Sequence, residues 1–164
     1  MKITLSEKLK KSLVIFLILG FINGCMSSNI KYPDNYKKNL TIKTSIKGES
    51  FFKDIDAYLH ISKLDKQCKP EYLGTVKLDK PIKKVGLPAN QKLFLEFVFG
   101  ITGGGSGSRL DMDTIITPRK GQSFYADMFY EDDIYDITLW QNKSRKYKKR
   151  KIRPASFKSC KKTK

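Results

Sequence analysis

Three observations predict an all-β fold, a single antiparallel β-sandwich. Apolar and polar residues alternate with period two over several short runs, which is typical of strands with one buried face. Turn residues, mainly Gly, Pro, Asp and Asn, separate these runs every roughly eight to twelve residues, a spacing that also suits a small barrel. The runs are rich in Ile, Phe and Tyr, and no heptad repeat, βαβ alternation or internal duplication is visible in the sequence.

The first strand is expected at Leu40–Ile46, where alternate residues share one apolar face. The motif IDAYLHI predicts the second strand, with one apolar face and one polar face: Ile55, Ala57, Leu59 and Ile61 against Asp56, Tyr58 and His60. A helix beginning near Phe51 competes with this strand, because Phe51, Ile55 and Leu59 also fit a 3.6-residue repeat. The alternation favours the strand.

A third strand is expected at Tyr72–Leu78, and the following DKPIKK predicts a proline-containing turn. VGLPANQ is a short apolar segment interrupted by Pro88. The next run, KLFLEFVFG, is apolar on both faces, with Leu93, Leu95, Phe97 and Phe99 on one side and Phe94 and Val98 on the other. A strand with two apolar faces is predicted to lie in the centre of a sheet.

Three more strands are expected within LDMDTIIT, SFYADMFYE and IYDITLW. The glycine-rich ITGGGSGS that precedes them predicts a loop between two strands. TPRKGQ, residues 117–122, contains Pro118 and Gly121 and predicts a hairpin between the first two of these strands. Asp132 and Asp133 predict the next turn.

The first 24 residues have the layout of a signal peptide. Four lysines and one glutamate precede Ser12–Ile22, an uncharged apolar run that is shorter than the roughly 20 residues a spanning helix needs. The motif Ile22-Asn23-Gly24-Cys25 that follows resembles the lipobox of bacterial lipoproteins, in which signal peptidase cleaves before a cysteine that receives acyl chains. The resemblance implies that Cys25 carries a lipid anchor made of more than one acyl chain.

The same resemblance implies a location. Met26 stands where lipoproteins retained in the inner membrane of Gram-negative cells have Asp, so the expected destination is the outer membrane, facing the periplasm. The polar, turn-rich Met26–Asn39 predicts a flexible tether. The expected organisation is a signal peptide over 1–24, a lipidated tether over 25–39, a β-sandwich over 40–141 and a basic segment over 142–164.

A second resemblance concerns the domain itself. Cys-x-x-x-Tyr-Leu-Gly-Thr-Val from Cys68, Val-Gly-Leu-Pro-Ala from Val85 and the turn Thr-Pro-Arg-x-Gly from Thr117 follow one another in the chain. This order is similar to that of small uncharacterised bacterial lipoproteins with immunoglobulin- or transthyretin-like folds. The resemblance covers about residues 55–141 and implies a fold, but no activity.

Two cysteines remain after Cys25. Cys68 and Cys160 form an even pair, and an oxidising periplasm predicts a disulfide between them. A metal site or a redox pair is the alternative, but the sequence has no CxxC motif and His60 is its one histidine. No metal and no cofactor other than the covalent lipid is therefore expected.

The positive charge is concentrated at the C-terminus. The chain has a net charge of +17, yet residues 142–164 contain twelve Lys or Arg and no acid. The candidate anion-binding residues are Arg145, Lys146, Lys148, Lys149, Arg150, Lys151 and Arg153. Anionic lipid, lipopolysaccharide, peptidoglycan carboxylates or an acidic envelope protein would suit them, and export disfavours nucleic acid. Alternatively, Tyr147 and Ile152 continue the sheet as a final strand and leave these charges solvated.

No catalytic constellation is visible. GGGSGSR lacks the Gly-Lys-Ser/Thr and the following helix of a P-loop, and no base other than His60 is available to activate a nucleophile. The acids Asp111, Asp113, Asp127, Glu131, Asp132, Asp133 and Asp136 match no EF-hand. The sequence therefore predicts a non-enzymatic binding or assembly module. An anion-binding protein and a hydrolase that uses some of these carboxylates are the alternatives.

Overall fold

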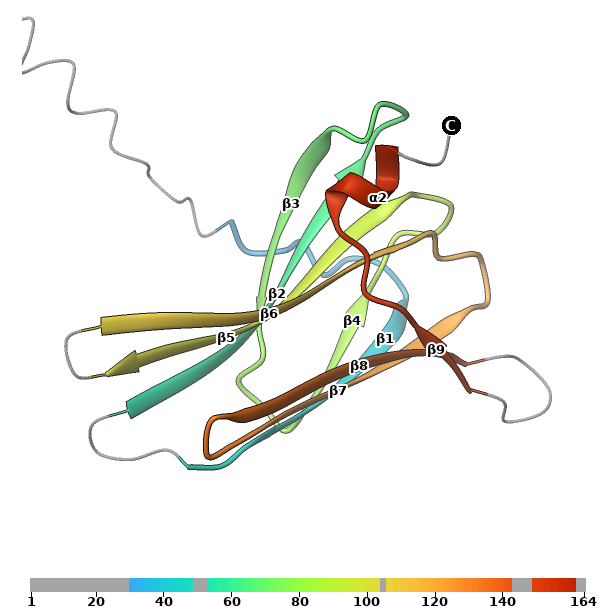
Figure 1. Ribbon diagram of the computed structural model, residues 1–164. Coiled ribbons are helices and arrows are strands. Elements are labelled where there is room, and N and C mark those ends of the chain that lie inside the picture. The colour runs from blue at the N-terminus through green and yellow to red at the C-terminus, as the bar shows by residue number, and fades with distance from the viewer. Residues whose placement is uncertain (1–29, 49–52, 104–105, 143–148, 162–164) are drawn as a thin grey trace, which may run out of the picture.

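The computed structural model describes residues 30–48, 53–103, 106–142 and 149–161, which form a β-sandwich (Figure 1). One sheet has the strand order β4-β1-β7-β8-β9 and the other has the order β3-β2-β5-β6. The strands are β1 Lys38–Ile46, β2 Lys53–Leu64, β3 Pro70–Lys77, β4 Ile82–Gly86, β5 Leu93–Gly103, β6 Ser106–Ile116, β7 Ser123–Glu131, β8 Ile134–Asn142 and β9 Lys149–Ile152. β1 and β7 run parallel, and the other strand pairs are antiparallel. The predicted all-β sandwich is confirmed.

The core lies between the two sheets and is made of alternate residues of each strand. The largest fully buried side chains come from both sheets: Phe97, Phe99, Leu59 and Ile61 from one, and Tyr130, Leu40, Ile42 and Met128 from the other. β5 lies between β2 and β6, and Phe94 and Val98 on its opposite face are also buried. The prediction of a central strand with two buried faces is confirmed.

The segment that allowed either a helix or a strand is a strand. β2 pairs with β3 on one side and with β5 on the other. Ile55, Ala57, Leu59 and Ile61 are all buried, as the alternation predicted. The turn at Asp132 and Asp133 is also present, and both residues have positive φ, as a tight β-hairpin turn requires.

One prediction about connections is partly right and another is wrong. The turn predicted over DKPIKK covers only its first three residues. The residues after DKPIKK's proline form β4, an edge strand in which only Val85 and Gly86 are buried and Ile82 is 59% exposed. Because β4 is short and mostly solvated, it has little of the alternation that identifies a strand. TPRKGQ is not a hairpin, since β6 and β7 belong to different sheets and the segment carries the chain across the sandwich. Turn residues indicate a reversal, but they do not specify which sheet the next strand joins.

The tether is shorter than expected. Residues 25–29 lie outside the described residues, but residues 30–39 pack against the domain. Tyr32 is buried, and its hydroxyl donates to the Gly86 carbonyl oxygen at 2.8 Å. Lys31 forms an isolated parallel β-bridge with Thr75 of β3, in which the Thr75 N–H donates to the Ile30 carbonyl oxygen at 2.7 Å. The second half of the expected tether is therefore part of the fold.

The C-terminal residues cross from one sheet to the other. After β9, residues 153–161, here called the C-terminal strap, pass the edge of β6, where the Ala155 N–H donates to the Asp113 carbonyl oxygen at 2.8 Å. The strap ends in the short helix α2, Phe157–Lys161, on the outer face of the four-stranded sheet (Figure 1). There Phe157 stacks on Phe94, and Cys160 forms the predicted disulfide with Cys68.

Among the described residues, no helix has the length and apolar character needed to cross a membrane.

Candidate functional site

The structure divides the predicted anion-binding residues into two groups. Arg150 and Lys151 lie in β9, and Arg153 begins the C-terminal strap. Lys149 is also in β9, but its side chain lies outside the described part. Arg145, Lys146, Lys148 and the predicted strand residue Tyr147 lie outside the described residues. The sequence also allowed a final strand in this segment, and that strand is present as β9, with Ile152 packed against the core.

The described basic residues of this strand and Arg153 of the strap are exposed, as that alternative predicted, but they also lie along one groove. Arg150, Lys151 and Arg153 line a groove of about 940 Å³ at the end of the sandwich, together with Arg119. The groove lies between β9, the C-terminal end of β6 and the β6–β7 connection. Its apolar part comes from Ile116, Phe124 and Ile152, and its polar part includes Gln122 and Gln141. We call it the basic groove.

Strand register explains why Arg150 faces this groove. Arg150 pairs with Gln141 of β8, which pairs with Phe124 of β7. Phe124 is buried between the sheets, and residues directly across neighbouring strands share a face, so this row points inward. Ile152 shares the face but is partly buried, whereas Arg150, one pleat further along, is exposed. The guanidinium therefore sits where the inner face opens to solvent.

Arg119 is positioned by a braced turn. The Arg119 N–H donates to Gln122 Oε1 at 2.9 Å, and the Gln122 N–H donates back to the Arg119 carbonyl oxygen at 3.0 Å. The preceding Pro118 is buried, and its carbonyl accepts the Asn90 N–H at 2.7 Å. These bonds hold the mouth of the groove on the side opposite β9.

Arg153 is positioned by a buried hydroxyl. Thr114 of β6 has no exposed surface, and its Oγ1 donates to the Arg153 carbonyl oxygen at 3.1 Å. The Ala155 bond and the Cys68–Cys160 disulfide hold the rest of the strap. Two segments that are distant in sequence, the β6–β7 connection and the run from β9 into the strap, therefore bring arginines to one groove.

The electrostatics of the groove favour an anion. Among the described residues that line it, four are basic and none is acidic. Within the described residues, none of these four cations has an ion-pair partner, whereas Lys47, Lys63, Lys77, Lys83 and Arg109 each pair with a carboxylate. Like charges around a shared groove repel one another, and a bound anion would relieve that repulsion.

The acids that the sequence grouped together are separated by the fold. Asp111 and Asp113 lie on the outer face of the four-stranded sheet, where they meet Glu96 with their oxygens within 4.8 Å of one another. Asp127 is on β7 of the other sheet, and Glu131, Asp132, Asp133 and Asp136 surround the β7–β8 turn. Of the three acids on which the hydrolase alternative drew, Asp111 and Asp113 come together, whereas Asp127 lies on the other sheet.

The carboxyl group of Asp113 has an unusual environment. Burial, together with the charges of Glu96 and Asp111, raises its pKa to about 6. Its Oδ1 has no hydrogen-bond partner within the described residues. Arg109 pairs with Glu96, and its Nε lies 3.7 Å from Asp111 Oδ1. Among the described residues, Asp113 has no such contact with a cation.

His60 lies on the polar face of β2, as predicted. Its Nδ1 is 2.7 Å from Thr75 Oγ1 and 3.3 Å from the Tyr72 hydroxyl, and burial lowers its pKa. The glycine-rich segment that invited a phosphate-binding interpretation lies largely within the β5–β6 pair, with Gly103 opposite Ser106 and no helix following. Residues 104–105 lie outside the described residues.

Sequence reasoning missed Arg119, Gln122, Gln141 and Glu96 as site residues. Arg119 was noted only as part of a turn motif, because nothing local indicates that this turn crosses the sandwich to meet β9. Knowledge of the strand order would have been needed to bring these residues together.

No known protein family, curated protein or solved structure matches this chain, and its function is therefore inferred from its residues and their arrangement.

Proposed function

We propose that this protein is a lipid-anchored, non-enzymatic binding module of the cell envelope that captures an anionic group in the basic groove. The observation that carries this proposal is that Arg119, Arg150, Lys151 and Arg153 line one groove, whose described lining contains no carboxylate. The groove volume falls in the range of sites for small ligands or for one headgroup of a larger molecule.

Guanidinium groups suit such a ligand. Arginine presents a planar set of donors that binds carboxylate or phosphate through two parallel hydrogen bonds. Such charge-assisted bonds are stronger than hydrogen bonds between neutral groups. Phosphate or carboxylate groups of anionic lipid, lipopolysaccharide or peptidoglycan meet this description.

The anchor gives this site its context. The lipobox resemblance implies acyl chains on Cys25, and the packing of residues 30–39 shortens the linker to the few residues after it. A short linker holds the groove near the membrane surface, where it raises the effective concentration of envelope ligands. The site can then serve a partner for which its intrinsic affinity is modest.

The test compares two charge-matched double variants of the mature chain. Arg119→Gln/Arg150→Gln removes two groove cations, and Lys66→Gln/Lys84→Gln removes two exposed cations elsewhere. Binding to anionic vesicles, lipopolysaccharide and peptidoglycan fragments is measured against salt concentration. We expect the groove variant to lose about tenfold or more in affinity and the control to change little. Equal losses would contradict the proposal, because they would show that only bulk charge matters.

A further inference from the structure

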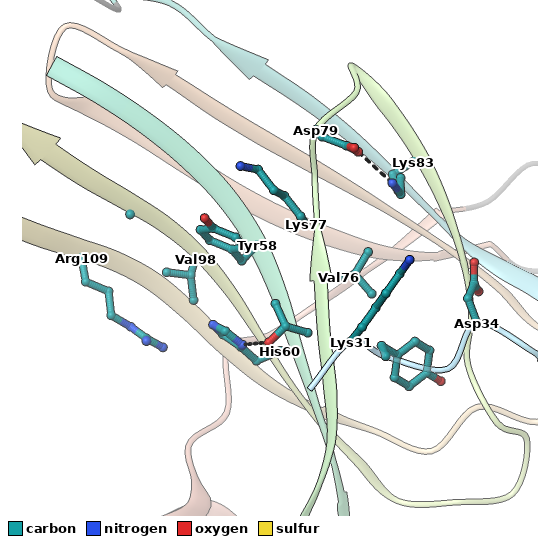
Figure 2. Close-up of a pocket in the computed structure, with 13 residues that line it drawn as sticks. Lys31, Asp34, Tyr58, His60, Val76, Lys77, Asp79, Lys83, Val98 and Arg109 are labelled. Carbon is teal, nitrogen blue, oxygen red and sulfur yellow. Dashed lines mark hydrogen bonds and ion pairs between the residues drawn. The ribbon is translucent and has the colours of Figure 1, made fainter. Parts of the chain in front are cut away.

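A second hollow lies away from the basic groove and has a different character. It occupies about 950 Å³ and its lining includes Tyr58, His60, Lys77, Gly100 and Arg109 (Figure 2). These residues come from β2, β3, β5 and β6, and they line the outer face of the four-stranded sheet rather than the gap between the sheets. Lys31 and Asp34 of the N-terminal segment line its other side (Figure 2).

Aromatic rings form the floor of this hollow. Tyr58 and His60 are half-buried, with ring centroids 6.3 Å apart and planes at 17°. Tyr72 lies beside this pair, next to the hollow rather than in its lining, with its ring centroid 6.4 Å from that of His60. We call Tyr58, His60 and Tyr72 the ring platform. A solvated sheet face does not need such rings for folding, because the core lies on the opposite side of β2.

The platform is preorganised. The Thr75 and Tyr72 hydroxyls, which bond to each other, both contact His60 Nδ1. The Lys77 Nζ lies 2.8 Å from Asp56 and 5.9 Å from the centre of the Tyr58 ring. Within the described part, His60 Nε2 has no bonding partner, which leaves it available to a ligand. Rings fixed in this way lose little freedom when a ligand stacks on them.

Glycine makes the hollow. Gly100 of β5 lies opposite Asp56 of β2 on one side and opposite Arg109 of β6 on the other. Because glycine has no side chain, the sheet face is open between these two residues. A Cβ at this position would meet the Tyr58 ring at 3.8 Å, which is ordinary contact. Larger side chains at Gly100 would therefore enter the hollow without disturbing the backbone.

The rim has both signs of charge, unlike the basic groove. The lining includes the acids Asp34 and Asp79 as well as basic residues, and Asp79 pairs with Lys83. Carboxylates accept hydrogen bonds from hydroxyl groups and cations donate to them, but carboxylates also repel the phosphates of a nucleic acid strand. A ligand that stacks on rings and carries many hydroxyls is a saccharide. We propose that the ring platform binds a neutral saccharide ring of an envelope glycan.

The experiment is an NMR titration of the mature chain with N-acetylglucosamine tetramer and with maltotetraose. We expect saturable shifts at β2 and β5 that persist at high salt. Tyr58→Leu and Gly100→Val should each weaken binding about tenfold or more, the first by removing the stacking surface and the second by filling the hollow. Two matched controls, Tyr135→Leu and Gly107→Val, change an exposed tyrosine and an exposed strand glycine outside the hollow and should leave binding unchanged.

Several outcomes would overturn the inference. The absence of binding to both saccharides is one, and binding that survives Tyr58→Leu and Gly100→Val is another. Salt-sensitive binding of a single-stranded oligonucleotide at this face, with no saccharide binding, would show that the ligand class is wrong. None of these outcomes tests the basic groove, because its lining residues are different. Arg119→Gln/Arg150→Gln leaves the ring platform intact and therefore serves as a further control.

Discussion

Gly74 shows how a single residue attaches the N-terminal segment to the sheet. It has φ +138°, and a Cβ there would lie 2.7 Å from backbone atoms of Tyr32. Gly74→Ala should therefore displace Tyr32 from its buried position and lower the free energy of unfolding by about 2 to 4 kcal/mol. Urea unfolding measures the loss, and proteolysis near Tyr36 should become faster.

Gly121→Ala is the matched control for this prediction. Gly121 also has positive φ, +84°, but no atom lies within 4 Å of its Cβ position. Its substitution should cost only the backbone strain, about 1 to 2 kcal/mol. Equal losses for the two variants would contradict the packing of the N-terminal segment against β3.

Asp113 provides a prediction about pH. Its folded pKa of about 6 is above the usual 3.8, so folding favours the protonated carboxyl group. The stability that this preference contributes is complete below the unfolded pKa and is lost as the pH rises through the folded pKa. Asp113→Asn, which mimics the protonated form, should thus be more stable than the parent protein at pH 8 by about 1 kcal/mol, after allowance for solvent screening.

Unfolding of both proteins at pH 4 and pH 8 checks this difference. At pH 4 the two stabilities should nearly coincide, because Asp113 is then protonated in the folded state. Asp127→Asn is a suitable control, since Asp127 lies on the other sheet. A pH-independent difference between Asp113→Asn and the parent protein would mean that Asp113 does not titrate in this range.

At the scale of elements, the C-terminal strap links the disulfide to the basic groove. Cys68→Ser/Cys160→Ser opens a loop with a sequence separation of 92 residues and should lower the free energy of unfolding by about 4 to 5 kcal/mol in the chain-entropy model. Because the strap carries Arg153, anion binding should weaken as well, even at temperatures where the domain remains folded. Vesicle binding alongside thermal unfolding separates these two effects.

Thr114→Val tests the same coupling without touching the disulfide. It removes the hydroxyl that holds the Arg153 carbonyl and should cost about 1 kcal/mol of stability. Affinity for anionic vesicles should fall by less than in the double cysteine variant. Unchanged anion binding in both variants would show that Arg153 does not need the strap to be held in place.

The strand elements also show what the sequence could predict. Period-two alternation identified β1, β2, β5, β7 and β8, because each of these strands buries one face against a shared core. β4 was missed because an edge strand with two buried residues carries little of that signal. Tyr32 was missed because one buried side chain in a polar segment has no periodicity.

The basic groove required information that no single element holds. Arg150 and Arg153 were named from local charge density, but Arg119 joins them only because TPRKGQ crosses between sheets. The disulfide was predicted from the count of cysteines and the expected compartment. Its consequence, a strap that holds Arg153 at β6, depends on three-dimensional proximity alone.

At the scale of the whole molecule, two separate surfaces carry different chemistry. The basic groove opens at the end of the sandwich between β6 and β9, whereas the ring platform covers the outer face of β2 and its neighbours. An envelope glycan that carries both neutral rings and anionic groups could engage both surfaces at once. Such bivalent contact would raise the apparent affinity well beyond that of either site alone.

The anchor prediction also belongs to this scale, because two forces could hold the molecule to a membrane. Acyl chains on Cys25 contribute about 0.8 kcal/mol per buried methylene, whereas each basic residue near an anionic surface contributes about 1 kcal/mol that salt screens. Membrane fractions washed with high salt should therefore retain the parent protein and lose Cys25→Ala. Cys68→Ala/Cys160→Ala, which removes the other two thiols, should remain bound. Mass spectrometry of the native amino terminus should show the acyl chains, and an unmodified terminus or release by salt alone would assign membrane attachment to the basic segment instead.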